Sequence, residues 1–513
     1  MSKLKYLSCI LQRGFSTSQP CSTSLNAFVN QTRSKLQAGQ ALHESRPHLL
    51  KAGELTPGIK ALEYYKRRVE LAEKLPSRSC AIIAGNTMKY ASGAVFYHFQ
   101  QNNNLFYLTG WNEPDSVMIL EKPNDNLDNV IFHMIVPPKD DFAERWEGFR
   151  TGTQGVKDIF NADETTDLSQ LSSYIAKVVK RNDYIYYDNP LSDSNKNDSA
   201  IFSNFFSLPS SNSKYDSDIM SLLSKYGTRK KVVALQKIIA TMRRIKSPAE
   251  LRIMRRAGQI SGRAYNHAIA KRFRNERSLQ AYLEYKFISG GCDRSAYIPV
   301  VAAGANALCI HYTRNNDIMY DDEMVLIDAS GSLGGYCSDI SRTWPVNGMF
   351  SEEQRDLYQA VLNVQKRSIE LCTASAGLSL HGVHEKSAEF MLEELKNAGI
   401  RNIDQTDINK LYPHYIGHNL GLDVHDVPGV SRHGNLQPGQ VITIEPGVYI
   451  PDNLKYPKYF RNIGIRIEDD IAIGENTYTN LTVEAAKEIV DLENIMQYGV
   501  STKFEDDIIE PLY

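Results

Sequence analysis

Several common functional signatures are missing from this 513-residue chain. It has no H-E-x-x-H zinc motif, no G-x-x-x-x-G-K-[ST] phosphate loop, no G-x-G-x-x-G dinucleotide motif and no G-x-S-x-G serine-hydrolase elbow. The 7 cysteines are widely spaced without a C-x-x-C pair, which argues against a disulfide framework or a cysteine zinc site and fits a reducing compartment. Nucleotide, thiol and serine-hydrolase chemistry therefore have no motif to support them.

Long apolar runs and a strong charge imbalance are also lacking. No stretch approaches the roughly 18 uncharged apolar residues of a transmembrane helix, so no membrane-spanning segment is expected. Lys and Arg number 58 and Asp and Glu 60, and the formal net charge of -2 favours neither nucleic acid nor an anionic membrane as the main partner. A hydrophobic content of 42% is typical of a globular protein, and the length predicts about three structural units.

The first 43 residues contain no Asp or Glu but five Lys or Arg among many Ser, Thr and Gln. This composition predicts a mitochondrial transit-like segment over residues 1–40, because a secretory signal would need a longer apolar core. The alternative is an N-terminal tail without targeting function. Within the segment, Arg13-Gly-Phe15-Ser16 resembles a matrix-protease site, with cleavage two residues after the arginine.

Residues 55–190 are expected to form an α/β domain without candidate ligands. A helical pattern follows Gly58 and ends near Lys74, before Pro76. Strand-like runs then occur at residues 80–84, 94–98, 105–108, 116–120, 130–136 and 184–187.

Residues 191–240 read as a polar insertion and linker, since Ser and Asn make up 12 of the 23 residues from 192 to 214.

A second domain is expected over 241–495, followed by an acidic tail over 496–513. This second domain begins with a capping box, Ser247-Pro-Ala-Glu250, which predicts the start of a helix. Ser351 is expected to open another helix. A further helix is expected over about 378–397, with His381 and His384 as surface residues.

A short hairpin carries the first candidate site residues. The apolar run from Met324 to Asp328 is followed by a glycine-rich turn and by a second strand-like run after Asp339. A turn centred on Leu333-Gly334 would place the two aspartates opposite each other, with Cβ atoms about 5 Å apart. Such a pair needs a positive charge between its members. Alternatively, one aspartate is a cap or turn residue and the register is off by one.

Three downstream segments also place histidine or acidic residues in glycine-rich or strand-like stretches. One is rich in histidine and contains His414, His418 and His425, with glycines that argue against a helix. Another is an apolar strand that ends in Glu445, and in the third Arg466 and Glu468 share one side of a strand by its period of two. Singly, each could be a strand-end acid in water or a core histidine.

Taken together, these segments predict a dimetal site. Four carboxylates carry a charge of -4, which two divalent cations would neutralise. Together with one imidazole and no thiolate they form an oxygen-rich ligand set that suits Mn²⁺ best, with Co²⁺, Fe²⁺ and Zn²⁺ as alternatives. Two metals about 3.5–4 Å apart can activate a shared water and polarise a carbonyl, so hydrolysis is the predicted chemistry. His425 and His311 are candidates to position substrate or to pass a proton.

The order of these candidates resembles the ligand set of the methionine aminopeptidase, aminopeptidase P and prolidase clan, which has the pita-bread fold. The matching motifs are D-x10-D, G-H-x-L-G-L-D-V-H-D, I-E-P-G-x-Y and R-I-E-D. The segment from Gln100 to Pro114 is similar to the aminopeptidase P amino-terminal domain, so the likeness covers about residues 55 to 495. It implies an α/β (α+β) N-terminal domain followed by a pita-bread catalytic domain. The insertion at 192–214 departs from the family pattern.

By this resemblance, Asp328 would bind one metal, Asp339 and Glu468 would bridge both, and His418 and Glu445 would hold the other. Glu445 would also be the general base. The implied catalytic residues are Glu445, His425 and His311, and the implied substrate-binding residues are His311, His414, His425, Arg466 and, less securely, Tyr449.

The likeness, with the transit-like start, points to the mitochondrial intermediate-cleaving branch of the family. It implies removal of one bulky N-terminal residue from imported proteins after matrix-protease cleavage, by a hydroxide that two metals activate. A matrix-side location is implied, and peripheral inner-membrane association and homo-oligomerisation are left open. The alternatives are Xaa-Pro aminopeptidase activity on peptides and an inactive pita-bread binding module; the latter is disfavoured because all five ligands are present.

Overall fold

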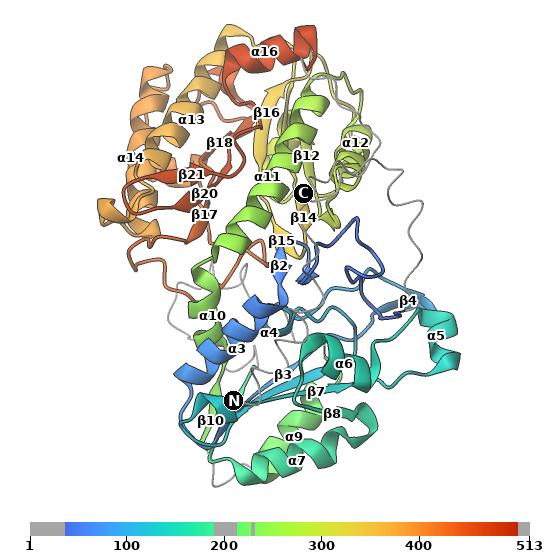
Figure 1. Cartoon of the computed structure of the whole chain (residues 1–513). Helices are drawn as coiled ribbons and strands as arrows, with labels where there is room; N and C mark the ends of the chain where they lie inside the picture. Colours follow the sequence, from blue (N-terminus) through green and yellow to red (C-terminus); the bar gives the residue numbers. More distant parts are fainter. Residues whose placement is uncertain (1–35, 189–212, 227–230, 501–513) are drawn as a thin grey trace, which may run out of the picture. The chain divides into compact units, whose positions relative to one another are not determined.

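The computed structural model describes residues 36–188, 213–226 and 231–500. The chain divides into two compact units, with the boundary after Ile238 (Figure 1). Most of the transit-like segment, most of the Ser/Asn-rich insertion and the end of the acidic tail lie outside the described residues. The predictions made for them stay predictions.

Unit 1 is an α/β unit around a mixed six-stranded sheet of order β10-β9-β3-β6-β7-β8. Strand β3 pairs antiparallel with β6 and parallel with β9. The elements of this unit are β1 (Glu54–Thr56), β2 (Ile59–Lys60), α3 (Ala61–Lys74), β3 (Ser79–Ala84), β4 (Tyr90–Ser92), β5 (Val95–Phe96), α4 (Asn103–Thr109), β6 (Val117–Lys122), β7 (Ile131–Val136), α5 (Asp141–Glu147), α6 (Gly152–Phe160), β8 (Glu164–Asp167), α7 (Leu171–Arg181), β9 (Tyr184–Tyr187), α9 (Asp216–Tyr226) and β10 (Lys231–Ala234).

Helices α7 and α9 cover one face of this sheet with apolar side chains. Ile175 and Val179 of α7 and Ile219 of α9 share a buried cluster with Ile82 and Ile119 of the central strands. Each fully buried side chain of this size contributes about 1.5–3 kcal/mol through the hydrophobic effect. Unit 1 therefore has a core of its own.

One predicted strand of unit 1 is wrong, because residues 105–108 belong to helix α4. Asn102 caps this helix, and its side chain accepts hydrogen bonds from the backbone N–H groups of Asn104 and Leu105. Gly110 ends it in the left-handed conformation, with φ of 71°. The apolar run resembled a strand because the last five residues of the short helix are all buried.

Unit 2 is built from short antiparallel sheets covered by longer helices (Figure 1). Its elements are α10 (Gln236–Arg244), in which the boundary between the units falls, α11 (Pro248–Ile269), α12 (Glu276–Ser289), β11 (Arg294–Ser295), β12 (Val300–Ala303), β13 (Met324–Asp328), β14 (Gly331–Leu333), β15 (Tyr336–Cys337), β16 (Ser341–Pro345), α13 (Glu352–Glu370), α14 (Leu380–Asn397), α15 (Gln405–Leu411), β17 (Val441–Ile444), β18 (Gly447–Ile450), β19 (Ile463–Arg466), β20 (Asp469–Ile473), β21 (Tyr478–Asn480) and α16 (Ile489–Tyr498).

The two predicted capping boxes are present. The Ser247 side chain accepts a hydrogen bond from the Glu250 N–H and the Glu250 side chain accepts from the Ser247 N–H, at the start of α11. Ser351 and Gln354 form the same reciprocal pair at the start of α13. Two long helices therefore begin where the sequence predicts.

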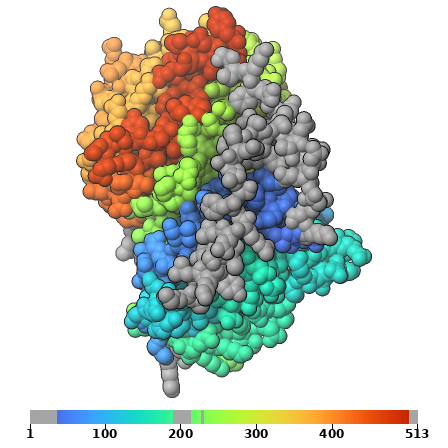
Figure 2. Space-filling model, in the orientation of Figure 1, coloured from blue at the N-terminus to red at the C-terminus, as the bar shows by residue number. Residues whose placement is uncertain are grey.

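Helix α11 approaches the C-terminal strands closely, and Figure 2 shows this green helix against the red C-terminal segment. A Cβ atom at Gly258 would lie 2.3 Å from the Leu481 carbonyl oxygen, so no larger side chain fits there. Arg255 donates a 2.9 Å hydrogen bond to the same oxygen. No helix among the described residues is long and apolar enough to cross a membrane.

Strand β16, which follows Asp339, lies beside the end of β19 and the residues that lead from it into β20. The N–H of Glu468 donates a 3.0 Å hydrogen bond to the carbonyl oxygen of Ser341, and Thr343 exchanges hydrogen bonds with the backbone of Arg466. These contacts bring the hairpin and the C-terminal strands to one place.

Candidate metal centre

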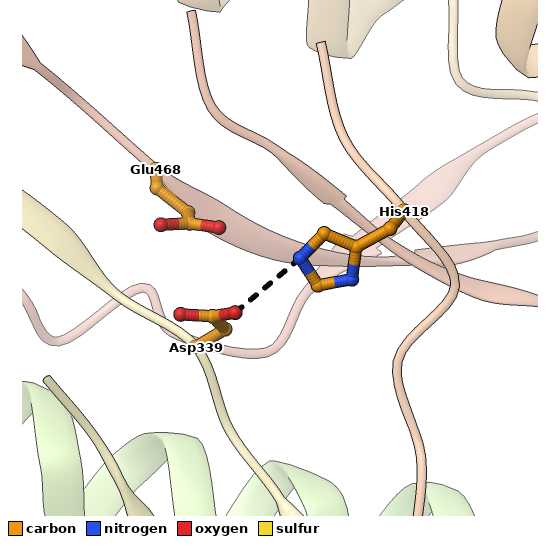
Figure 3. Close-up of side chains that lie close together, drawn as sticks. All are labelled: Asp339, His418 and Glu468. Atoms are coloured by element: carbon orange, nitrogen blue, oxygen red, sulfur yellow. Dashed lines mark ion pairs between the residues drawn. The ribbon is translucent and has the colours of Figure 1, made fainter. Parts of the chain in front are cut away.

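Three of the predicted ligands meet in the interior of unit 2. One ligand atom each of Asp339, His418 and Glu468 lies within 4.8 Å of the others, and the three residues approach from separate segments (Figure 3). No other group of this kind is found in the part of the chain that the structure describes. This cluster is therefore the candidate metal centre.

The register predicted for the hairpin is wrong, but the prediction that Asp328 and Asp339 share one face still holds. Asp328 pairs with Ser341 and not with Asp339, because the turn centres on Gly334-Gly335. Both glycines have positive φ, 58° and 85°, which a tight turn of this kind requires. The partner of Asp328 is shifted by two residues, and since side chains alternate with a period of two, both aspartates still share one face.

Tyr297 lies between these two aspartates, and the sequence analysis missed it. Its hydroxyl group is within hydrogen-bond distance of one carboxylate oxygen of Asp328 and one of Asp339. Burial raises the pKa of Tyr297, and the two carboxylates raise it further, so the phenol stays protonated. No motif marks this tyrosine, because it precedes β12 rather than the hairpin that it contacts.

His418 is held with one ring nitrogen ready to bind a metal. Its Nδ1–H donates to the Asn419 carbonyl oxygen at 3.0 Å, which leaves the lone pair on Nε2. Nε2 lies 3.5 Å from Asp339 Oδ2 and 3.6 Å from Glu445 Oε1. Burial alone would lower the pKa of His418, but the neighbouring carboxylates outweigh it and raise that pKa.

The carboxylates of the centre are buried with too little positive charge around them. Burial and mutual repulsion raise the pKa of Asp339, that of Glu445 to about 7, and that of Glu468 well above its ordinary value. Carboxylates in such a place need cations to stay ionised. The donor set, four carboxylates and a neutral imidazole, therefore fits divalent metal ions.

Arg466 connects the candidate metal ligands to the substrate-side residues. Its Nη2 donates to Asp328 Oδ2 at 2.7 Å, and its Nη1 donates to the Tyr449 hydroxyl at 2.7 Å. Its Nε donates to the Ser341 hydroxyl at 2.9 Å, which in turn donates to Glu468 Oε2 at 2.6 Å. Arg466 and Glu468 thus lie on the same side, as the strand period predicts.

His414 is neutral, and its hydrogen bonds define the tautomer. Nδ1–H donates to the Tyr415 carbonyl oxygen at 2.8 Å, so Nε2 accepts from the Tyr449 hydroxyl at 2.9 Å. Burial and the charge of Arg466 lower the pKa of His414 to about 3. Its Nδ1 also lies 3.8 Å from Glu445 Oε2, which places it beside the centre.

His425 and His311 stand at the edge of the same site. The ring of His425 packs edge-on against that of His418, with centroids 4.3 Å apart, and part of it reaches solvent. Desolvation and the charges of His418, His311 and Arg432 lower its pKa to about 2. His311 is exposed, and its charge also acts on His414.

The two histidines of α14 are not simple surface residues. His384 stacks on Tyr415 with centroids 4.3 Å apart, and His381 hydrogen-bonds the Tyr415 hydroxyl. Burial lowers the pKa of His384 to about 4. They pack behind His414 rather than joining the metal cluster, because Tyr415 follows His414 directly in the chain.

A buried cluster of carboxylates around one imidazole, on a fold of this kind, defines a metal-dependent hydrolase. The chain belongs to metallopeptidase family M24, whose family model matches residues 252–475, and the aminopeptidase P N-terminal domain model matches residues 64–186. The predicted family and fold class are therefore confirmed.

Two relatives are similar to this protein over most of its length. Intermediate cleaving peptidase 55 of Saccharomyces cerevisiae is 64% identical over 95% of this chain and 94% of its own length. Human Xaa-Pro aminopeptidase 3 is 35% identical over 89% of this chain and 90% of its own.

Solved structures support the same family. A crystal structure of Icp55 from S. cerevisiae, lacking its N-terminal 58 residues, is 62% identical and covers 87% of this chain and 100% of its own, with a TM-score of 0.79. Aminopeptidase P from Escherichia coli with the inhibitor Pro-Leu is 30% identical, covers 86% of this chain and 99% of its own, and has a TM-score of 0.77. The protein is thus a metallopeptidase with relatives of two names, intermediate cleaving peptidase and Xaa-Pro aminopeptidase.

Proposed function

We propose that this protein is a dimetal aminopeptidase that hydrolyses the first peptide bond of its substrates. The observation that carries the proposal is the convergence of Asp339, His418 and Glu468 within 4.8 Å. Asp339 and Glu468 would bind both ions, Asp328 one of them, and His418 and Glu445 the other. Mn²⁺ suits this oxygen-rich set best. When bound, the two ions supply an activated water and polarise the scissile carbonyl group.

The chain's own residues would position the substrate and move protons. Glu445 would take the proton of the attacking water, and His425 would stabilise the transition state or protonate the leaving amine. His311, His414 and Arg466 would orient the peptide, with the hydrogen bond from Tyr449 holding His414 in place. The neutral state of His414 supports a role as a hydrogen-bonding group rather than a charge.

The proposed substrates are imported mitochondrial proteins that retain a bulky N-terminal residue such as Tyr, Leu or Phe after matrix-protease cleavage. The S. cerevisiae relative named above and a 36% identical one from Arabidopsis thaliana, named intermediate cleaving peptidase 55, mitochondrial, support this substrate class and a mitochondrial location. The name of the human relative favours Xaa-Pro aminopeptidase activity as the second candidate.

Peptide cleavage separates the two candidates. Peptides that begin Tyr-Ser, Phe-Ser and Ala-Pro are incubated with the Mn²⁺-loaded protein, and the loss of one residue is followed by mass spectrometry. We expect removal of Tyr and Phe, with Asp339→Ala as the inactive control. Cleavage of the Ala-Pro peptide alone would replace the first candidate with the second, and cleavage of none would contradict both.

A further inference from the structure

A buried ion cluster lies directly behind His425. Asp426 is 3% exposed, and its carboxylate accepts a 2.8 Å hydrogen bond from Lys246 Nζ and another from Arg243 Nη2. Lys246 and Arg243 are themselves buried, at 5% and 6% exposure. We call these three residues the Asp426 cluster. Arg243 Nη2 also donates to Asp423 Oδ2 at 2.6 Å, so two cations face two carboxylates. The cluster is held tightly in place, because losing either cation leaves one negative charge uncompensated.

The cations of the Asp426 cluster are fixed to the frame of unit 2. Lys246 Nζ also donates to the Arg243 carbonyl oxygen at 2.7 Å, and its backbone N–H donates to the Gly439 carbonyl oxygen at 2.8 Å. The next residue, Ser247, is the N-cap of α11. Arg243 lies in the last turn of α10. Asp426 is therefore anchored to the junction of two helices.

The loop between the two histidines is closed around the Asp426 cluster. The N–H of Asp426 donates to the Asn419 carbonyl oxygen at 2.8 Å, which joins the residue after His418 to the residue after His425. Gly421 leaves the space for this closure, since a Cβ atom there would lie 2.5 Å from Asp426 Oδ2 and 3.0 Å from Lys246 Cε. The rings of the two histidines meet as a result.

Val427 shows that the backbone is held against its preference. It has φ of 44°, a conformation that a β-branched residue adopts only when its surroundings force it. Val427 is buried and follows Asp426 directly. Strain of this kind persists where a neighbouring contact over-determines the structure, and the ion cluster is such a contact.

We propose that the Asp426 cluster is a positioning device, in which Lys246 and Arg243 hold Asp426 and thereby set the place of the His425 ring beside the candidate metal centre. Lys246, Arg243 and Asp426 are positioning residues and not catalytic ones. The inference rests on the proposed role of His425, although the placement of the loop can be tested without any assay of activity.

The first test measures the loop itself. Hydrogen–deuterium exchange is compared between the wild-type protein and Lys246→Met, with Lys122→Met as the matched control, because Lys122 is a buried lysine of unit 1 that donates to two backbone carbonyl oxygens. We expect faster exchange in peptides covering residues 419–427 of Lys246→Met alone, with the other peptides unchanged. Unchanged exchange there, or equal acceleration throughout unit 2, would overturn the proposal.

The second test uses kinetics on the peptide that the wild-type protein cleaves. Lys246→Met should lower kcat roughly 10- to 100-fold with little change in KM, since small misplacements of a reacting group have effects of that size. In a His425→Ala background it should cause no further loss, because the group that it positions is gone. If the kcat losses of the two single substitutions multiply in the double variant, the proposal is contradicted. If Lys246→Met does not fold, Asp426→Asn, which keeps the side-chain shape, takes its place in both tests.

Discussion

Two neighbouring residues of unit 2, Glu468 and Asp469, bury their carboxylates in opposite settings. Asp469 is fully buried and accepts hydrogen bonds from Arg342 at 2.7 Å, Gln365 at 2.8 Å and Lys487 at 2.5 Å. Its pKa falls far below the ordinary value, because these cations outweigh its burial. Glu468 faces the other way, toward Asp339, and its pKa is raised by burial and by like charges.

The opposite pKa shifts of Asp469 and Glu468 show where the fold supplies cationic side chains for a buried carboxylate and where it does not. Both carboxylates are removed from water, which costs free energy unless the charge is compensated. Around Asp469, Arg342 and Lys487 compensate it within the fold. Around Glu468, the single positive charge of Arg466 does not balance the four carboxylates of the centre, so divalent metal ions would supply the remaining compensation. Substitutions on the two sides should therefore have opposite effects on stability and activity.

The largest effect is expected on the metal side. Asp339→Ala should lower kcat by at least about 1,000-fold, since the loss of a bridging ligand removes several kcal/mol of transition-state stabilisation. The metal-free variant should unfold no earlier than metal-free wild type, because one of the repelling charges is gone. Peptide hydrolysis and thermal unfolding with and without chelator measure both; full turnover by the variant would contradict the dimetal proposal.

On the opposite side, Arg342→Met should destabilise unit 2 by about 3–5 kcal/mol, because a buried ion pair is broken and Asp469 loses one of its cations. Urea unfolding of the chelator-treated protein measures this loss. It should be equally large with and without metal, unlike the effect of Asp339→Ala. A wild-type midpoint would show that Lys487 alone compensates the charge.

Unit 1 offers a third carboxylate with cations of its own. Burial by itself raises the pKa of Glu121, but hydrogen bonds from His133, Arg181 and Asn182 lower it to about 2. Because the folded pKa lies below the unfolded value, its stabilising effect is complete above about pH 4.5 and is lost as the pH falls toward 2. This amounts to about 3 kcal/mol.

Glu121→Gln should remove this acid dependence from the unfolding of unit 1. The measurement is the urea midpoint between pH 5 and pH 3, compared with Glu144→Gln, an acid of the same unit whose carboxylate lies 3.8 Å from Lys139. An unchanged slope for the Glu121 variant would mean that folding does not lower the pKa of the Glu121 carboxyl in the wild-type protein.

A residue beside the centre that holds no metal should have the smallest effect. His425→Ala should lower kcat by about 100-fold, the usual range for a lost acid–base group, and leave the bound metal in place. Metal content by mass spectrometry, alongside kinetics, separates this from a loss of ligands. Wild-type kcat with full metal content would remove His425 from the proposed mechanism.

The parts of this protein that sequence could predict are those written in local patterns. The order of Asp328, Asp339, His418, Glu445 and Glu468 indicated the family, and the boxes at Ser247 and Ser351 fixed two helix starts. These signals depend on neighbouring residues and on spacing that the chain alone sets.

The misses depend on contacts that no local pattern records. The hairpin register turned on which two glycines take positive φ, and residues 105–108 form a helix because of the Asn102 cap. Tyr297 was missed because it reaches the aspartates across 31 and 42 residues of chain. The role of Asp469 could not be predicted either, because only the fold shows that Arg342 and Lys487 form ion pairs with its carboxylate.

The hydrogen bond between Ser341 and Glu468 joins residues 127 apart in the chain. Closing so long a loop costs conformational entropy that grows with the logarithm of its length. Because Ser341 and the neighbouring Arg342–Asp469 pair already close it, the metal ions would not have to draw two distant segments together when they bind. The free energy of metal binding would then be available as affinity, because the contacts that close the loop do not depend on the ions.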